Sequence, residues 1–449
     1  MSAIVYGAGI SGRGAAEVLA KHGEQVFLYN DNPTSISEEL SALLEKNNGG
    51  LVIGSENWSA LLEKAGLLVL SPGIPTDIEN IRVAEQKSIK IISEVELGYK
   101  NYAGHMAAIT GTNGKTTTTT IVGEMFKRLP VPSAVGGNIG MALSKEVEAL
   151  PKDSWFAAEL SSFQLERVET FAPEIAAVLN LTPDHLDRHH TMEAYGEAKK
   201  NIFRLQDASK YTVLNYDDPI VKTWDKDSSG QICFFSRKVQ LEQGIFMQNG
   251  NFVIKWKDKE YTVCNVKDVK LFGGHNEENI LCAIACGFFA GVSIEDMADV
   301  LKNFNAVEHR IEYVTTINGV PYYNDSKATN TDSVIKALEA FENGHIILLA
   351  GGYDKMTDLT EMMNLAKEKC DCVILLGAAQ ARFNEAAIAA GIENIRLATS
   401  FKDAVDIAYE IAQKPQVVLL SPACSSYDMF KNYPERGNTF KALVRALEK

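Results

Sequence analysis

The sequence predicts an α/β protein of three domains, each built around a mostly parallel sheet. Two glycine-rich turns, at residues 7–12 and 111–116, each stand between a short apolar run and a helix-like segment. The last third of the chain also alternates apolar runs with helix-like segments, and its apolar runs end in polar loops. With 449 residues, 46% of them hydrophobic, the chain is long enough for about three domains.

The first domain is expected over residues 1–94 and is Rossmann-like. A strand at 3–6 leads into G-A-G-I-S-G at 7–12 and then into a helix pattern. A second strand, 25–29, ends close to Asp31, about where an acidic residue meets a ribose in dinucleotide folds. Further strands are expected at 67–70, before the S-P-G turn at 71–73, and at 89–92. Taken alone, the motif predicts a dinucleotide fold, and a glycine turn without a ligand is the alternative.

The second glycine turn, T-G-T-N-G-K-T at 110–116, lies between a strand at 106–109 and a helix pattern at 121–126. Its glycines let the backbone approach a phosphate closely, Lys115 adds a positive charge, and Thr116 offers a hydroxyl to Mg²⁺. The standard Walker pattern would have a glycine at 109, where this chain has isoleucine. The loop predicts binding of a nucleoside triphosphate, and a threonine-rich loop without a ligand is the alternative.

The central domain, expected over 95–306, places further polar residues near this loop. Strands at 155–158 and 175–179 run into polar clusters, and ligands gather at the carboxyl ends of strands in open α/β sheets. We therefore expect Glu159 and His185 to share a site with Thr116. A buried, salt-bridged glutamate is the alternative for Glu159, and most of the polar run 184–190 is expected to be surface loop. The turn-rich stretch 211–270 predicts a β-rich extension.

The third domain, expected over 307–449, is a second Rossmann-like unit. Its strands are predicted at 345–350, 372–376 and 417–420. The segment N-D-S-K-A-T-N at 324–330 gathers a carboxylate, hydroxyls, a lysine and amides within seven residues. Such a segment can bridge a ribose, a phosphate and a second substrate, and a turn with a helix cap is the alternative.

Charge and cysteine usage restrict the possible partners and the compartment. A net charge of −14 argues against nucleic acid or an anionic membrane as the main partner. The seven cysteines include no C-x-x-C pair, and Cys282 and Cys286 fall in an apolar helix-like run, which favours free buried thiols in a reducing compartment. The N-terminus lacks a basic region, and no apolar run approaches the roughly 20 residues of a membrane span. We expect a soluble, cytoplasmic protein.

Several segments together resemble the Mur ligases of peptidoglycan synthesis, in order and through all three predicted domains. They are G-T-N-G-K-T (111–116), E-L-S-S-F-Q-L-E (159–166), N-L-T-P-D-H-L-D (180–187), G-G-H-N-E-E-N (273–279), H-R (309–310), N-D-S-K-A-T-N (324–330) and S-P-A-C-S-S-Y-D-M-F-K-N-Y-P-E-R-G (421–437). The second and the last of these are most similar to the D-glutamate-adding branch of the family.

The resemblance implies an ATP-dependent, amide-forming ligase that acts as a monomer. Its substrates would be UDP-N-acetylmuramoyl-L-alanine, ATP and D-glutamate, and two Mg²⁺ ions would assist. The substrate carboxylate would take the γ-phosphate of ATP to give an acyl phosphate, which the amine of D-glutamate would then attack. Both steps build negative charge on oxygen atoms, so cations must be supplied at the site.

The resemblance also implies roles for individual residues. The catalytic set is Lys115, Glu159, His185, Lys199 and Lys327. The Mg²⁺ ligands are Thr116, Glu159, His185 and Lys199, the last as a carbamate. ATP would be contacted by Gly111, Thr112, Asn113, Gly114, Lys115, Thr116, Thr117, Asn276, Asn279, Arg310 and Asp325. The UDP-linked substrate would be contacted by Gly9, Ile10, Ser11, Gly12, Asp31, Ser71, Pro72, Gly73, Asn138 and Ser161, and D-glutamate by Thr329, Lys355, Ser426, Tyr427 and Tyr433.

Three features depart from the family pattern or leave a choice open. Residues 30–32 stand where some members have an arginine near the uracil end, and Tyr427 and Tyr433 replace residues that are often aliphatic and Phe. Lys199 has a lysine neighbour, Lys200, and the Y-x-x-A-K spacing favours Lys199, although an exposed helical lysine is the ordinary interpretation of any such residue.

Rival functions remain. A nicotinamide-dependent dehydrogenase would use the turn at 7–12 and Asp31, but it leaves the loop at 111–116 and Lys327 unexplained. A regulatory ATP-binding switch without ligase activity is a second rival. A nearer one is another Mur ligase that adds a different amino acid, and the segments 159–164 and 421–437 speak against it.

Overall fold

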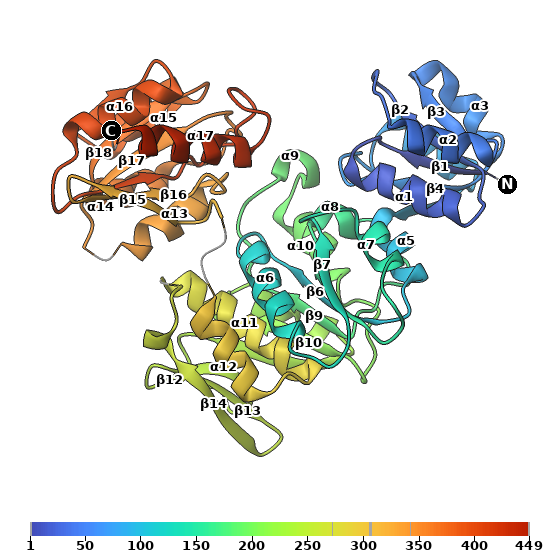
Figure 1. Cartoon of the computed structure of the whole chain (residues 1–449), viewed down its shortest axis with the longest axis horizontal. Coiled ribbons are helices and arrows are strands. Elements are labelled where there is room, and N and C mark those ends of the chain that lie inside the picture. The colour runs from blue at the N-terminus through green and yellow to red at the C-terminus, as the bar shows by residue number, and fades with distance from the viewer. Residues whose placement is uncertain (1, 272, 305–307, 342, 448–449) are drawn as a thin grey trace. The chain divides into compact units, whose positions relative to one another are not determined.

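The computed structural model describes residues 2–271, 273–304, 308–341 and 343–447 (Figure 1). Its strands form three sheets of five, nine and six strands. This confirms the predicted α/β class with three parallel-dominated sheets. By contacts, the chain forms two units: Met1–Leu181 with His185–Val269 and Glu278–Asn303, and Thr182–Asp184 with Lys270–Glu277 and Phe304–Lys449. The expected boundary at 306/307 lies outside the described residues.

The first sheet is fully parallel and has the order β3-β2-β1-β4-β5. A carbon added at Gly12 would lie 1.7 Å from the carbonyl oxygen of Gly7, so only glycine lets helix α1 start this close to β1. The elements are β1 (Ser2–Tyr6), α1 (Ile10–Lys21), β2 (Val26–Asn30), α2 (Glu38–Lys46), β3 (Gly50–Ile53), η1 (Ser55–Asn57), α3 (Trp58–Leu62), β4 (Ala65–Leu70), α4 (Glu79–Gln86), β5 (Lys90–Ser93) and α5 (Glu94–Asn101).

The second sheet has the order β14-β13-β12-β11-β10-β9-β6-β8-β7. It is parallel from β7 to β12 and ends in the antiparallel strands β13 and β14, so the β-rich stretch continues the same sheet. Its strands are β6 (His105–Thr110), β7 (Ser133–Gly137), β8 (Trp155–Glu159), β9 (Ile175–Val178), β10 (Tyr211–Asn215), β11 (Gln231–Ser236), β12 (Gly244–Gln248), β13 (Asn251–Trp256) and β14 (Lys259–Asn265).

The helices of this part of the chain are α6 (Lys115–Phe126), α7 (Leu143–Glu148), α8 (Ser162–Leu165), α9 (Leu186–His189), α10 (Met192–Lys200), η2 (Val221–Asp227), η3 (Val266–Asp268), α11 (Gly274–Ala290) and α12 (Ile294–Asn303). Helix α6 begins earlier than the predicted 121–126 because Gly114, with φ +84°, turns the chain directly into the helix at Lys115. The threonine run is therefore helical, and Thr117, Thr118 and Thr119 are buried.

The third sheet has the order β15-β16-β20-β17-β18-β19 and is parallel except for the β15–β16 pair. Apolar side chains bury both of its faces. The elements are β15 (Glu312–Ile317), β16 (Val320–Asn324), α13 (Thr331–Ala340), β17 (Ile346–Gly351), α14 (Thr360–Lys369), β18 (Cys370–Leu376), α15 (Gln380–Ala390), β19 (Ile395–Leu397), α16 (Phe401–Ile411), β20 (Val417–Leu420) and α17 (Tyr433–Ala446).

The state of the cysteines and the length and polarity of the helices can be compared with the sequence. All seven cysteines are free thiols, and Cys282 and Cys286 lie fully buried in α11 as the apolar run predicted. In the part of the chain that the structure describes, every helix is too short or too polar to cross a membrane.

Candidate active site

The phosphate-type loop lies between β6 and α6 and is shaped by two glycines with positive φ. Gly111 has φ +151° and Gly114 has φ +84°. A carbon added at Gly114 would lie 2.1 Å from the Oδ1 atom of Asn279, so this predicted ATP residue packs against the loop. Asn180, which follows β9, accepts the N–H of Thr112 at its carbonyl (3.0 Å) and the N–H of Asn113 at its Oδ1 atom (2.8 Å). Asn180 begins the N-L-T-P-D-H-L-D segment, and the motif alone gives no role for its amide.

Two lysines converge on one backbone carbonyl of this loop. Lys115 Nζ donates to the oxygens of Gly111 (2.9 Å) and Thr112 (2.8 Å). Lys199 Nζ, from α10, donates to the same Gly111 oxygen at 2.8 Å. Two ammonium groups beside a loop of small residues create a local excess of positive charge, which favours a phosphate anion.

Lys199 and its neighbour Lys200 have different surroundings. Lys199 is 1% exposed, and its ammonium lies over the Tyr195 ring at 4.5 Å. Lys200 instead forms ion pairs with Glu197 (2.9 Å) and Asp227 (2.6 Å). The ordinary interpretation as an exposed helical lysine therefore does not fit Lys199, and only Lys199 reaches the loop.

Glu159 ends β8, the strand beside β6, and is 2% exposed. Its Oε1 atom accepts a hydrogen bond from Asn138 Nδ2 at 3.0 Å, while its Oε2 atom is buried without a hydrogen-bond partner. A buried carboxylate oxygen left in this state is costly unless a cation or donor reaches it. The arrangement differs from the salt-bridged alternative and fits a ligand for a hard cation such as Mg²⁺. Thr116, at the start of α6, is also buried.

The polar run after β9 contains both exposed and buried residues. His185 adopts a left-handed conformation (φ 55°) immediately before the short helix α9, and its ring contacts Phe163 at 4.9 Å between centroids. His189 is 8% exposed, lies 2.9 Å from the hydroxyl of Ser162 through Nε2, and stacks on Phe163. Leu186, Asp187 and His190 are exposed, as expected for most of this run, whereas aromatic side chains from α8 and α10 cover His189. This burial lowers the pKa of His189.

Arg188, for which the sequence predicts no role, joins this run to the S-P-G turn. Its guanidinium donates to the carbonyl oxygens of Pro72 (3.1 Å) and Ile74 (3.0 Å), to Glu166 (2.8 Å), and lies 4.4 Å from the Phe163 ring centre. Arg188, three residues after the metal candidate His185, thus holds the S-P-G turn that is expected to contact the UDP-linked substrate.

The residues assigned to the UDP-linked substrate divide into accessible and internally bonded groups. Gly9, Ile10 and Gly73 are exposed, and Ser11 and Pro72 are half-buried. By contrast, Ser71 donates to the Gly7 oxygen at 2.8 Å, and Ser161 caps α8 through a capping box with Gln164. Asn138 bonds Glu159 through both its side chain and its backbone N–H.

Asp31 follows β2 and holds two tyrosines of the first sheet. It accepts hydrogen bonds from the hydroxyls of Tyr6 and Tyr29, the latter at 2.7 Å. Burial and the negative charge of Asp31 raise the pKa of both tyrosines. The carboxylate is thus engaged within its own domain.

In the second unit, Asp325 is a buried carboxyl between two elements of the third sheet. It accepts from the Ser421 hydroxyl at 2.7 Å and from the N–H of Ile311 at 3.2 Å. Desolvation raises its pKa to about 7, and the charge of Arg310 opposes this rise. The Nε atom of Arg310 is buried without a hydrogen-bond partner, as expected for a side chain whose partner is a ligand.

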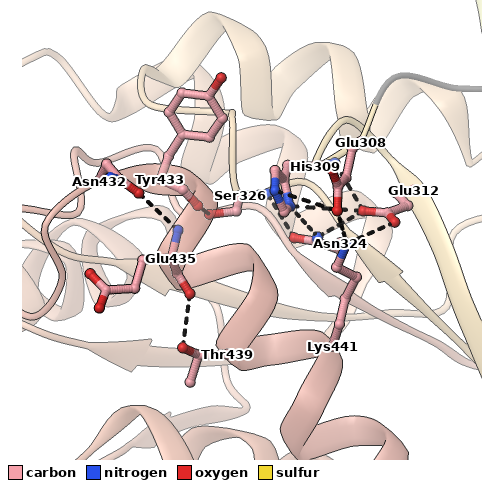
Figure 2. Close-up of polar contacts among 10 residues, drawn as sticks. All are labelled: Glu308, His309, Glu312, Asn324, Ser326, Asn432, Tyr433, Glu435, Thr439 and Lys441. Atoms are coloured by element: carbon pink, nitrogen blue, oxygen red, sulfur yellow. Dashed lines mark hydrogen bonds and ion pairs between the residues drawn. The ribbon is translucent and has the colours of Figure 1, made fainter.

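A polar network holds the segment that carries Asp325 and Lys327 (Figure 2). The carbonyl of His309 accepts the N–H of Lys327 at 3.0 Å, and the His309 ring Nδ1 lies 2.9 Å from the amide nitrogen of Asn324. Glu312 accepts from that amide nitrogen (3.0 Å) and from the N–H of His309 (2.9 Å). Ring burial lowers the pKa of His309, which favours the neutral imidazole that this contact needs.

The C-terminal helix α17 completes this network. Arg436, which is fully buried, donates to the hydroxyl (3.0 Å) and carbonyl (2.7 Å) of Ser326. Glu308, His309 and Glu312 bring three potential metal ligands within 4.8 Å of one another, but Lys441 Nζ contacts both glutamates. Figure 2 shows this lysine reaching from the helix between the two carboxylates, so an ammonium already supplies the positive charge there.

The residues assigned to D-glutamate are only partly gathered. Tyr433 begins α17, and its ring lies 5.3 Å from the Lys327 ammonium. Ser426 is buried, while Thr329 and Lys355 are half-buried. Tyr427 is 71% exposed, so its side chain is directed to solvent. Asn276, assigned to ATP, is buried in the first turns of α11.

Comparisons with known proteins agree with the motifs. The family model described as the Mur ligase middle domain matches residues 109–287, and the Mur ligase glutamate ligase domain matches residues 309–424. The UDP-N-acetylmuramoylalanine–D-glutamate ligase of Lachnoclostridium phytofermentans is 42% identical over 445 residues, covering 99% of this chain and 98% of that protein.

Solved structures share the fold at low sequence identity. MurF from Acinetobacter baumannii has a TM-score of 0.64 at 18% identity, covering 99% of this chain and 93% of that one. The MurF ligase from Thermotoga maritima in complex with ADP has a TM-score of 0.63 at 15% identity, covering 94% of this chain and 96% of that one. From the near-complete match to the curated ligase, the chain belongs to the Mur ligase family, within its UDP-N-acetylmuramoylalanine–D-glutamate ligases.

Proposed function

We propose that this chain is the ATP-dependent ligase that adds D-glutamate to UDP-N-acetylmuramoyl-L-alanine during the synthesis of peptidoglycan precursors. The observation that carries the proposal is identity of 42% to a ligase of that name over 99% of the chain. The position of the Lys115 ammonium at the carbonyls of Gly111 and Thr112 supports it, because a phosphate-transfer site needs local positive charge.

In the first step, a carboxylate oxygen of UDP-N-acetylmuramoyl-L-alanine attacks the γ-phosphorus of ATP. The bond from that phosphorus to the β–γ bridging oxygen breaks, ADP leaves, and an acyl phosphate remains. The glycine loop with Lys115 holds the β- and γ-phosphates, and Arg310 and Lys327 supply further positive charge. Asp325 holds the ribose of ATP, and Asn279, which packs against Gly114, contacts ATP from the side of the loop. The unpartnered Arg310 Nε atom supports a role in anion binding.

The donors at the loop fit Mg²⁺. Thr116 and Glu159 would hold one ion, and His185 with a carbamate on Lys199 would hold a second. Bound Mg²⁺ neutralises charge on the phosphoryl oxygens as they are transferred. The unpartnered Oε2 atom of Glu159 supports the first site, and the burial of Lys199 next to the loop supports the second. A lysine that stays neutral long enough can add CO₂ and become an oxygen ligand.

In the second step, the amine of D-glutamate attacks the carbonyl carbon of the acyl phosphate. A tetrahedral intermediate forms, the carbon–oxygen bond to phosphate breaks, and the surplus proton leaves the nitrogen. Lys355 pairs with a carboxylate of D-glutamate, because an ammonium matches that group in charge. Thr329, Ser426 and Tyr433 line the same pocket, and Tyr427 joins them only if its exposed ring turns inward.

Each domain has its own part in this scheme. Residues 1–94 hold the UDP-linked substrate, 95–306 hold ATP, and 307–449 hold the incoming amino acid. A monomer acting in the cytoplasm suffices, because all the assigned residues come from one chain and the substrates are soluble. Light scattering of the purified protein and fractionation of cells check these two points.

One assay tests the proposal as a whole. Phosphate release is measured with ATP, Mg²⁺ and UDP-N-acetylmuramoyl-L-alanine, adding D-glutamate, L-alanine, a diamino acid or a dipeptide in turn. Release is expected with D-glutamate only. Release with another amino acid would move the chain to a different branch, and release without any acceptor would favour the regulatory ATP switch. Absorbance at 340 nm with nicotinamide cofactors should not change, which excludes the dehydrogenase.

A further inference from the structure

We propose that Arg382 is a positioning residue for Lys355 and thereby sets the affinity of the enzyme for its amino-acid substrate. This inference rests on the proposed role of Lys355 in binding a D-glutamate carboxylate. Arg382 itself has no assigned role in the reaction. It lies on α15, away in sequence from every motif that identified the site.

The guanidinium of Arg382 fastens the segment that carries Lys355 at two points. Its Nε and Nη2 atoms donate to the two carboxylate oxygens of Asp354, each at 2.7 Å. Its Nη1 atom donates to the carbonyl oxygen of Thr357 at 2.9 Å. A planar guanidinium can make all three bonds at once, and a bidentate pair with a carboxylate fixes orientation as well as distance.

Lys355 lies between these two anchors. The segment connects β17 to α14, and it starts from Gly351 and Gly352, which have φ +122° and +143°. Asp354 also accepts the N–H of Met356 at 2.8 Å, and Met356 has a left-handed backbone (φ 56°). The backbone of Lys355 is therefore held on both sides, and its ammonium forms an ion pair with the Asp184 carboxylate at 3.6 Å, a contact that a ligand carboxylate would share or replace. The ion pair with Arg382 lowers the pKa of Asp354, in keeping with a lasting contact.

Arg382 is partly exposed and lies outside the apolar core, so its positioning role can be distinguished from a role in core packing. Its side chain is 28% exposed and Asp354 is 18% exposed. Arg382 also borders a cavity of about 490 Å³, together with Met356, Thr357, Leu359 and Met363. Removing the guanidinium would leave the apolar core of the third sheet in place and release the segment toward this open space. The expected consequence is a misplaced Lys355 in a folded protein.

The test measures KM for each substrate, kcat and the melting temperature in variants of the full chain. Arg382→Ala should raise KM for D-glutamate about tenfold or more, the scale of a lost charge-assisted contact. The KM for ATP and for the UDP-linked substrate should stay within about twofold, because Arg382 bonds the segment that carries Lys355. A tenfold change in either KM would correspond to about 1.4 kcal/mol. Arg382→Lys should recover only part of the loss, because an ammonium cannot hold Asp354 and the Thr357 carbonyl in one plane.

Matched variants make the result specific. Lys402→Ala, in the same unit, removes an exposed ion pair with Asp406 and should leave every KM unchanged. Lys355→Ala provides the reference loss of D-glutamate affinity. In the double variant Lys355→Ala/Arg382→Ala, KM for D-glutamate should equal that of Lys355→Ala alone, because Arg382 acts only through Lys355.

Other outcomes would overturn the inference in distinguishable ways. If Lys355→Ala raises KM for D-glutamate and Arg382→Ala does not, Arg382 has no positioning role. If the two losses add in the double variant, Arg382 acts independently of Lys355. If Lys355→Ala itself leaves KM unchanged, the assignment of Lys355 fails first. If Arg382→Ala melts below the assay temperature, Asp354→Asn is tested instead, since the amide keeps the shape of the carboxylate and loses its charge. An unchanged KM for D-glutamate in Asp354→Asn would also contradict the positioning role of Arg382.

Discussion

The side-chain nitrogen of Lys199 lies 2.8 Å from the carbonyl oxygen of Gly111, the same atom that Lys115 Nζ approaches at 2.9 Å. Two donors to one carbonyl make the start of the loop depend on the charge of both lysines. A carbamate on Lys199 would replace an ammonium by an anion and leave the nitrogen a single N–H to donate to Gly111. Lys115 and Asn180 would still hold the loop, and the carbamate would offer oxygen atoms to a metal ion.

The first prediction concerns Lys199. Lys199→Ala should lower turnover by about a hundredfold or more, the scale of losing a group that stabilises transition-state charge. Short-chain carboxylates should restore part of the activity by occupying the place of the carbamate. Lys200→Ala is the matched control and should stay near full activity, because Lys200 contacts Glu197, Asp227 and the Trp224 ring rather than the loop. Equal losses in both variants, or no rescue at any carboxylate concentration, would contradict the assignment.

A second prediction addresses the phosphate loop and its acidic partner. Lys115→Ala and Glu159→Ala should each lower kcat by about a hundredfold to a thousandfold while the circular dichroism spectrum is unchanged. Lys127→Ala serves as the control, since Lys127 follows the same helix and pairs with exposed Glu124. Glu159→Ala should also raise the Mg²⁺ concentration that half-saturates the reaction. Substantial turnover in either site variant would show that the loop is not the reaction centre.

The third prediction follows from the contacts of Arg188. Arg188→Ala should raise KM for the UDP-linked substrate several-fold, because the carbonyls of Pro72 and Ile74 and the carboxylate of Glu166 lose their common donor. Arg167→Ala is the comparison, since Arg167 bonds Glu85 of α4 at 2.7 Å without touching the S-P-G turn. Steady-state kinetics with each substrate varied in turn distinguishes them. The same KM in both variants would mean that Arg188 has only a structural effect.

The fourth prediction is a pH dependence of stability that arises from Asp325. Burial raises the pKa of Asp325 from 3.8 to about 7, so the folded ligand-free protein keeps a proton that the unfolded chain releases. The contribution of this group to stability is therefore complete below pH 3.8 and is lost as the pH rises toward 7. Asp325→Asn should gain melting temperature relative to the unchanged protein as the pH rises from 5 to 7, and level off above. A difference that is constant with pH would contradict this.

Much of the fold could be predicted because the decisive signals are local. The turns at 7–12 and 111–116 need glycine where α1 and α6 begin, and a carbon at Gly12 or Gly114 would meet a neighbouring oxygen within 2.1 Å. Strands β7 and β19 were not predicted. Strand β7 ends in two glycines and β19 has three residues, so their pairing with β8 and β18 decides their conformation.

The candidate site shows the same division between local and long-range effects. Glu159 and His185 could be selected because they follow strands, and Lys199 because its segment resembles a family motif. His189, Arg188 and Arg382 could not, because their roles depend on contacts far along the chain. Arg188 bonds Pro72, which is 116 positions away, and Arg382 bonds Asp354, which is 28 away. Sequence patterns report periodicity and turns, whereas these contacts depend on how the sheets and helices pack.

Burial of the cysteine thiols also lowers their reactivity toward oxidants and electrophiles. Burial raises the pKa of Cys264 and Cys372 to about 11 and that of Cys424 to about 12. Since the thiolate is the reactive form, these sulfurs stay protonated and unreactive at neutral pH. A cysteine introduced on the surface, for example Ile388→Cys at a position that is 61% exposed, would react with a maleimide dye well ahead of them. At neutral pH these three thiols would therefore compete little with a surface cysteine for such a dye.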